Sequence, residues 1–198
     1  MPHSVKTTLA TASVPRFWNV PNSLTVARLA LSVAVFLLIS AGAYAWALGV
    51  FILAAITDAL DGYFARLLNQ GTPLGRQLDP LVDKVIVCGT YIYLIAIPGT
   101  GIWPGMVAII VIRELLIQGL RSHLEGKGHD FSAKMVGKLK TVFQCLSISA
   151  VLLALSLTSP PPSLILLRDI LTWTAVLLTL WSGLSYGLNA ISRLRGDA

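Results

Sequence analysis

Four aspartates lie between two strongly apolar segments, at spacings that allow them to act together. Asp58 and Asp61 are three residues apart, and Asp79 and Asp83 are four apart. On an α-helix, residues at these spacings share one face about one turn apart. If residues 69–73 form a turn, the two helices are antiparallel and the four carboxylates can converge. Such a cluster needs cations, and it suits Mg2+, Mn2+ or Ca2+ better than zinc because no His or Cys lies within it.

The residues around the aspartates favour chemistry over a purely structural role. Gly62, Ala65 and Gly75 leave room for a flat group to approach the backbone closely. Asp79 precedes Pro80, which by itself is typical of a helix start. Four acids at these spacings beside apolar segments are better explained by function, because ionisable groups at membrane depth are usually functional. The pattern predicts a metal-dependent site for phosphate chemistry at a membrane surface.

The elements that must position these residues are membrane helices. The 198 residues are 55% hydrophobic and 12% charged, with a mean hydropathy of +0.76, whereas soluble domains carry about 25% charged residues. A bilayer core needs about 20 mostly apolar residues per helix. The sequence therefore predicts an all-α integral membrane bundle of six transmembrane helices with a cytoplasm-facing polar cavity. The helices are expected over residues 22–41, 44–68, 78–97, 102–123, 135–157 and 164–190.

The distribution of basic residues predicts the orientation of the bundle. With six antiparallel helices, fourteen of the fifteen Lys and Arg residues fall on the side of the termini and the aspartates, and only Arg168 lies near the other side. The positive-inside rule places the basic side in the cytoplasm, in a multi-pass protein of the cell membrane. The net charge of +6 then matches anionic lipids and phosphate substrates rather than nucleic acid.

The domain organisation is expected to be simple. Residues 1–15 are polar, lack the apolar core of a signal peptide and are predicted to be mobile. Residues 16–195 are predicted to form a single membrane domain.

The aspartate stretch reads D-x2-D-G-x2-A-R-x8-G-x3-D-x3-D and resembles the complete signature of the CDP-alcohol phosphatidyltransferase family. Its fixed positions are Asp58, Asp61, Gly62, Ala65, Arg66, Gly75, Asp79 and Asp83. The resemblance implies transfer of a phosphatidyl group from CDP-diacylglycerol to an alcohol, with release of CMP. It also implies a homodimer among membrane lipids.

The resemblance assigns roles to individual residues. The four aspartates would bind two Mg2+ or Mn2+ ions, and Asp83 would also be the general base. The small residues would line the cytidine pocket, and Arg66 would meet the diphosphate. Asn22, Thr25 and Arg28 recur every three residues on one face of the first helix. Arg28 lies inside an apolar helix without a nearby acid in sequence, so it needs an anionic partner, which the CDP moiety or an aspartate could supply. The CDP-binding set is Asn22, Thr25, Gly62, Ala65, Arg66 and Gly75.

Basic residues in the later segments predict a second phosphate site. Arg113 interrupts an apolar run, and Arg121 and Lys138 can face the same cytoplasmic cavity. Clustered Arg and Lys side chains suit a phosphorylated acceptor better than a neutral one. The acceptor-phosphate set is Arg28, Arg113, Arg121, Lys138 and Lys140. The segments PNSLTVARL, IRELLIQGLR and LTLWSGLSY also resemble family members that use glycerol 3-phosphate.

Other functions remain open at this point. The same fold could use inositol phosphate, serine or phosphatidylglycerol as acceptor. A divalent-cation transporter would need an ion path across the bilayer, yet the carboxylates cluster toward one face. A non-catalytic lipid-binding protein would not need Asp83 together with the metal ligands.

Overall fold

The computed structural model describes residues 20–68, 73–126 and 135–196, all but sixteen of which lie in six long α-helices joined by short turns. The helices are α1 (Val20–Ser40), α2 (Tyr44–Leu68), α3 (Pro73–Ile95), α4 (Pro104–Gly126), α5 (Met135–Ser156) and α6 (Pro162–Gly196). No strand occurs within the described ranges, so the all-α prediction is confirmed. The predicted mobile segment 1–15 and most of the predicted turn at 69–73 lie outside them.

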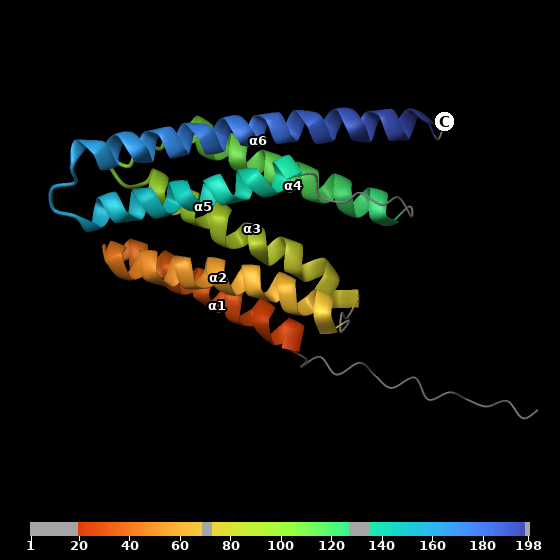
Figure 1. Cartoon of the computed structure of the whole chain (residues 1–198), viewed down its shortest axis with the longest axis horizontal. Helices are drawn as coiled ribbons and strands as arrows, with labels where there is room; N and C mark the ends of the chain where they lie inside the picture. Colours follow the sequence, from red (N-terminus) through yellow and green to blue (C-terminus); the bar gives the residue numbers. More distant parts are fainter. Residues whose placement is uncertain (1–19, 69–72, 127–134, 197–198) are drawn as a thin grey trace, which may run out of the picture.

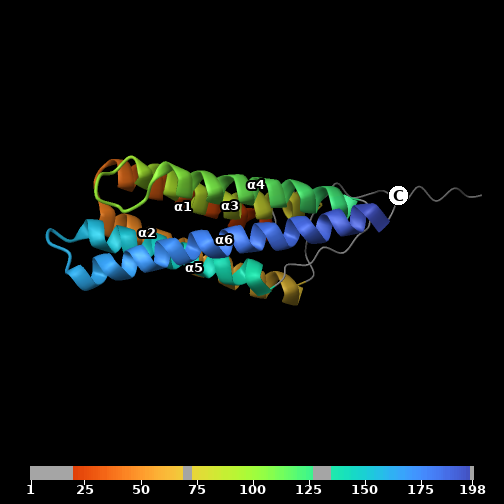
Figure 2. The ribbon, with the colours of Figure 1, turned by 90° about the horizontal axis from the view of Figure 1, so that it is seen from above.

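The helices form two groups of three. In Figure 1, α1 and α2 lie below α4, α5 and α6, with α3 between them, and Figure 2 shows the helices extending along the same long axis. In the first group α1 packs against both α2 and α3, and in the second α6 packs against both α4 and α5. Contacts of α2 with α5 and of α3 with α4 join the groups. The end of α2 and the start of α3 therefore lie at the same end of the bundle as the end of α4 and the start of α5.

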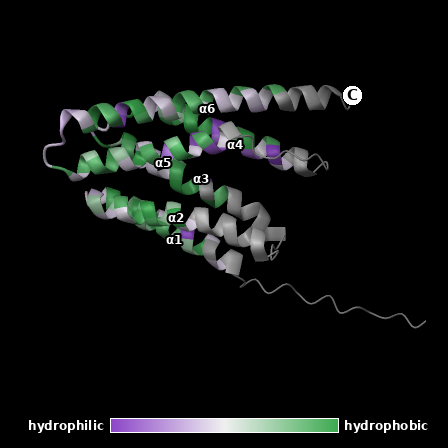
Figure 3. Cartoon of the chain, in the orientation of Figure 1, coloured by the Kyte–Doolittle hydropathy of each residue, from purple (hydrophilic) through white to green (hydrophobic). Residues whose placement is uncertain are grey.

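Apolar side chains cover much of the outer surface as well as the core. Hydrophobic residues occur along all six helices in Figure 3, and Leu37, Trp46 and Trp181 are each more than 60% exposed. Within the described residues, Gly137–Ser156 and Pro162–Leu188 are long and apolar enough to cross a membrane. The described apolar parts of α1, α2 and α3 are shorter, and Arg113 and Glu114 interrupt α4. The six-span arrangement stays a prediction.

Helix boundaries agree with the predicted ranges to within three residues except at two ends. Helix α2 has the predicted bounds, whereas α3 begins at Pro73, five residues before the predicted start at 78. Pro73 is a suitable first residue because its φ is fixed near the helical value. Proline has no N–H, and the N–H of the first helical residue would have no partner within the helix. Pro80 was taken as a sign of the helix start, but it lies inside α3. Helix α6 continues to Gly196, six residues past the predicted end.

A close contact between α1 and α3 fixes how the aspartate-bearing helix α3 lies in the first group. The rings of Phe36 and Tyr93 are stacked, with centroids 4.9 Å apart and an angle of 7° between the planes. Gly89, one turn before Tyr93, lies directly under the Phe36 ring, where a β-carbon would overlap it. The absence of a side chain at Gly89 therefore allows α1 to pack closely on α3.

The end of the bundle away from the aspartates is held by Arg168 of α6. Its Nη1 donates to the carbonyl of Gly99 at 2.6 Å, and its Nη2 lies 2.7 Å from the carboxylate of Asp169. Gly101 has φ of 74°, and a β-carbon there would lie 2.7 Å from that carboxylate. This arrangement anchors the α3–α4 turn to α6 and gives Arg168 a structural role.

Candidate functional site

The four aspartates occupy matched positions on α2 and α3. Asp58 lies ten residues before the end of α2, and Asp83 lies ten residues after the start of α3. At a rise of 1.5 Å per residue, each is about 15 Å from its helix end. The four intervening residues, 69–72, limit the separation of the two ends to about 18 Å. Asp58 and Asp83 are therefore equally far from helix ends that lie at the same end of the bundle, and Asp61 and Asp79 are about one turn nearer those ends.

The convergence of the carboxylates stays a prediction, because the side chains of residues 58–80 and of Asp83 lie outside the described part. The same holds for Gly62, Ala65, Arg66 and Gly75, which have helical backbone on α2 and α3. Asn22 is in the first turn of α1, and its side chain is likewise not described. Of the predicted CDP-binding set, Thr25 is described in full, and it is buried. Among described side chains, no cluster of three or more His, Cys, Asp or Glu residues occurs.

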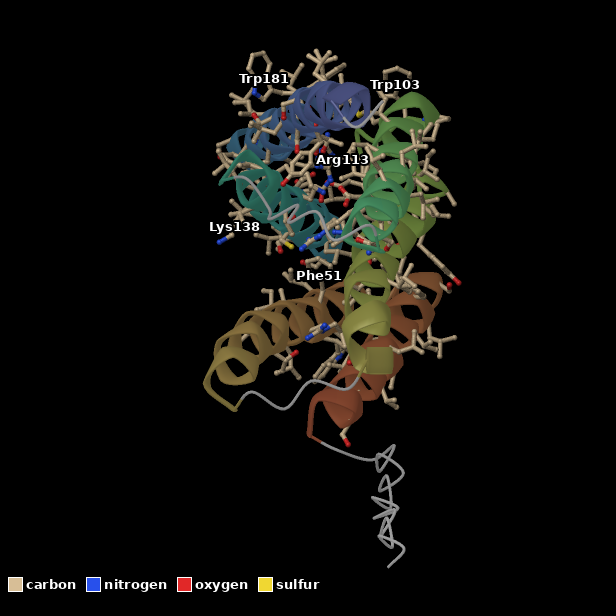
Figure 4. All side chains as sticks on the ribbon, turned by 90° about the vertical axis from the view of Figure 1, so that its right-hand side faces the viewer. Phe51, Trp103, Arg113, Lys138 and Trp181 are labelled. Carbon is tan, nitrogen blue, oxygen red and sulfur yellow. The ribbon has the colours of Figure 1, made fainter. Side chains whose placement is uncertain are left out.

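The five residues predicted for the acceptor phosphate line one cavity of about 510 Å³. They come from three helices: Arg28 on α1, Arg113 and Arg121 on α4, and Lys138 and Lys140 on α5. Arg28 and Lys140 are buried. Figure 4 shows Arg113 inside the bundle between α4, α5 and α6, whereas the side chain of Lys138 points outward from α5. The structure thus gathers the predicted set, with Lys138 at the rim.

The cavity reaches the helices that carry the aspartates. Phe51 and Ala54 of α2 line it, and Ala54 is one turn before Asp58. Lys84 of α3 also lines it and directly follows Asp83. The basic cavity and the aspartate motif are therefore neighbouring parts of one region.

Glu114 is the centre of the charged groups in the cavity. Its side chain is 1% exposed, and its carboxylate lies 3.1 Å from the Nζ of Lys84 and 3.3 Å from the Nη1 of Arg113. The Nζ of Lys140 forms a third ion pair with the same carboxylate. A buried charge is stable only when it is paired, and three cations from α3, α4 and α5 provide the pairing here.

Arg113 is held in place by α6. Its Nη2 donates to the Oγ of Ser182 at 2.5 Å, and its guanidinium carbon lies 5.7 Å from the centroid of the Tyr186 ring. A β-carbon on Gly183 would lie 3.0 Å from the Cγ of Arg113, so a side chain at that position would press on Arg113. The segment LTLWSGLSY therefore supports the basic cavity through Ser182, Gly183 and Tyr186.

The sequence did not predict four residues of this region: Lys84, Glu114, Gln144 and Tyr186. One signal was available for Glu114, because a single carboxylate beside an arginine inside an apolar run implies partners in space. Lys84 was visible only as the residue after Asp83. Nothing in the sequence showed that Lys84 and Glu114, thirty residues apart, form an ion pair.

Comparison with known proteins assigns the chain to one family, both by a family model and by individual relatives. The model of the CDP-alcohol phosphatidyltransferase family matches residues 18–181. A CDP-diacylglycerol–glycerol-3-phosphate 3-phosphatidyltransferase of Bacillus subtilis is 37% identical over 188 residues, covering 85% of this chain and 93% of the relative. Proteins of the same name from Rickettsia prowazekii and Pseudomonas fluorescens are 35% and 34% identical, covering 85% and 90% of this chain and 93% of each relative.

The matched range contains the whole aspartate motif and the helices that line most of the cavity. The chain belongs to the CDP-alcohol phosphatidyltransferase family.

Proposed function

We propose that this protein transfers a phosphatidyl group from CDP-diacylglycerol to sn-glycerol 3-phosphate, giving phosphatidylglycerophosphate and CMP. The observation that carries the proposal is the basic cavity beside the aspartate-bearing ends of α2 and α3. Relatives from three bacteria that cover most of the chain carry the name of this activity. Among the acceptors considered, glycerol 3-phosphate and inositol phosphate bring a phosphate monoester to such a cavity, and serine does not.

The phosphate of the acceptor would bind among the cations of the cavity. Arg113 has guanidinium N–H groups besides those bonded to Glu114 and Ser182 that can donate to phosphate oxygens, and Lys140 offers a point charge beside it. Arg28 and Arg121 complete the wall, and Lys138 at the rim would attract the anion from water. A phosphate held here would leave the free hydroxyls of the acceptor to point toward the aspartates.

A divalent metal fits the aspartate set. Asp58, Asp61, Asp79 and Asp83 supply only carboxylate oxygens, which Mg2+ or Mn2+ prefers, and two such ions would balance the four negative charges. When bound, the ions would neutralise the diphosphate of the CDP-lipid and stabilise charge on the departing phosphate.

Asp83 would act as the general base. The attacking hydroxyl must lose its proton as its oxygen bonds to the phosphatidyl phosphorus, and a carboxylate within hydrogen-bond reach can accept that proton. As the new P–O bond forms, the bond from this phosphorus to the oxygen of CMP breaks, and the electron pair leaves with CMP. No covalent intermediate on the protein is needed.

The CDP moiety would occupy the space between α1, α2 and α3. Thr25 and Asn22 would contact it from α1, with Arg66 near the diphosphate. Gly62, Ala65 and Gly75 would allow the cytidine to lie close to the backbone.

The protein would lie in the cell membrane as one six-span domain over residues 16–195, with the site on the cytoplasmic face and residues 1–15 outside the domain. The exposed apolar faces of the helices support a lipid environment, because soluble monomers rarely expose such extensive apolar surface. The lipid tails of the substrate would then lie between helices. A homodimer is expected from the family resemblance.

Purified protein would test this function by release of CMP from CDP-diacylglycerol in the presence of Mg2+. Glycerol 3-phosphate, inositol phosphate and serine would each be supplied alone. We expect release with glycerol 3-phosphate only. Release with a different acceptor would show that this acceptor is the substrate instead. No release from folded protein with any acceptor would contradict the proposal that the protein is an enzyme of this kind.

A further inference from the structure

Glu114 has no assigned part in the reaction, yet three charged groups of the cavity contact it. Lys84 of α3, Arg113 of α4 and Lys140 of α5 all form ion pairs with its carboxylate. It is the sole carboxylate among the described residues that line the cavity. Three helices from both halves of the bundle therefore meet at one buried anion.

The carboxylate is itself held in position. The Nε2 of Gln144 donates to the Oγ1 of Thr179 at 3.0 Å and lies 3.5 Å from the Oε1 of Glu114. Thr179 donates in turn to the carbonyl of Ala175 at 2.6 Å. Gln144 on α5 and Thr179 on α6 thus limit the movement of Glu114, so the three cations bind a fixed anion rather than a mobile one.

The charges around Glu114 leave the cavity positive. Among the described residues that line it, basic side chains outnumber the one carboxylate, and three of them form ion pairs with that carboxylate. A phosphate monoester carries close to two negative charges near neutral pH because its second pKa is about 6. Without the carboxylate, three positive groups in a desolvated space would repel one another, and the lysines could be accommodated only by moving apart or losing a proton.

We propose that Glu114 is a positioning residue that holds Lys84, Arg113 and Lys140 as a preorganised cradle for the dianionic phosphate of the acceptor. This inference rests on the proposed function, because it assumes that the three cations bind the phosphate of the acceptor and not the diphosphate of the CDP-lipid. It also bears on selectivity, because a positively charged cradle favours a doubly charged phosphate monoester over a neutral alcohol or a singly charged phosphodiester.

The test is steady-state kinetics of the purified full chain with CDP-diacylglycerol and glycerol 3-phosphate varied in turn. Glu114→Gln keeps the size of the side chain and removes its charge. We expect this variant to raise the KM for glycerol 3-phosphate at least tenfold and to leave the KM for CDP-diacylglycerol within about twofold. Glu114→Asp keeps the carboxylate on a shorter side chain and is expected to restore part of the affinity for glycerol 3-phosphate.

Thr172→Val is a matched control for a merely structural effect. Thr172 is a buried polar residue of α6 that shares a hydrogen bond of 2.8 Å with Ser147, and neither residue lines the cavity. The control should lower the Tm in detergent without changing the KM for either substrate. If Glu114→Gln does not fold, Glu114→Asp carries the test through its own rise in KM for glycerol 3-phosphate.

Two results would separate this inference from the proposed function. An unchanged or lower KM for glycerol 3-phosphate in Glu114→Gln, with an active wild type, would overturn the positioning role and leave the function intact. A lower KM in particular would show that Glu114 competes with the substrate for the cations. A wild type that releases no CMP with glycerol 3-phosphate would overturn both.

Discussion

The Nζ of Lys84 lies 3.1 Å from the Oε2 of Glu114, and this ion pair joins α3 to α4 inside the cavity. Lys84 directly follows Asp83, the last aspartate of the motif. The pair therefore ties the aspartate-bearing helix of the first three-helix group to the basic wall contributed by the second. A lipid-nucleotide site and an acceptor site need such a connection, because reacting atoms must be held about 3 Å apart.

Asp83 is expected to be needed for turnover but not for binding of the lipid nucleotide. Asp83→Asn should lower kcat at least 100-fold, since general bases typically contribute factors of 10² to 10⁴. Binding of CDP-diacylglycerol, measured as the shift that the lipid causes in Tm, should be retained. Thr90→Val is a control on the same helix, because the Thr90 hydroxyl bonds only to the carbonyl of Ile86 among described contacts. Near-normal turnover of Asp83→Asn would remove Asp83 from the mechanism.

Removal of divalent metal should abolish the activity. Four carboxylates with no His or Cys among them bind Mg2+ or Mn2+ in preference to softer ions. Exhaustive chelation should therefore reduce CMP release to the background rate, and added Mg2+ or Mn2+ should restore it while Zn2+ should not. Full activity after chelation, with the metal content verified by elemental analysis, is the contrary result.

The depth of each cation in the cavity predicts its contribution to acceptor binding. Arg113 lies inside the bundle and is held by Ser182, whereas Lys138 points outward at the rim. Arg113→Lys keeps the charge but loses the planar guanidinium and its hydrogen bond to Ser182, and it should raise the KM for glycerol 3-phosphate about tenfold or more. Lys138→Ala should raise that KM about twofold to threefold, with a stronger effect at low salt. Equal increases in this KM for the two variants would show that the depth of a cation in the cavity does not decide how much it contributes to acceptor binding.

Gly89 should be intolerant of even a small side chain. The β-carbon of Gly89→Ala would overlap the Phe36 ring, which would have to leave its stacked position on Tyr93. We expect a loss of about 1–3 kcal/mol in the free energy of unfolding, visible as a lower Tm in detergent. Gly49→Ala is the matched control, because nothing lies within 4 Å of its added β-carbon and alanine is the better helix former. A Gly89→Ala variant as stable as Gly49→Ala would show that α1 does not depend on this contact.

The helices could be predicted from the sequence because long apolar runs broken by glycine and proline are local signals. Helix α2 was predicted with its observed bounds, and the predicted ranges 22–41 and 44–68 leave a break between the first two helices close to the observed one. The start of α3 was predicted too late because Pro80 was given the role that Pro73 has. A proline inside a helix removes one hydrogen bond, and local rules favour placing it at the start.

The cavity could be predicted only in part. Basic residues inside apolar helices signal a functional region, so Arg28 and Arg113 were found. The ion pairs of Glu114 with Lys84 and Lys140 depend on how α3, α4 and α5 pack, which no local pattern specifies. The roles of Ser182 and Tyr186 likewise follow from the packing of α6 on α4.

The central claim is that glycerol 3-phosphate is the acceptor, and a competition assay tests it most directly. Purified protein with Mg2+ and CDP-diacylglycerol would receive glycerol 3-phosphate, inositol phosphate, serine and phosphatidylglycerol together at equal concentration. The lipid products would be identified by mass spectrometry. We expect phosphatidylglycerophosphate to be the dominant product, formed in amounts equal to the CMP released. A dominant product from any other acceptor would contradict the account.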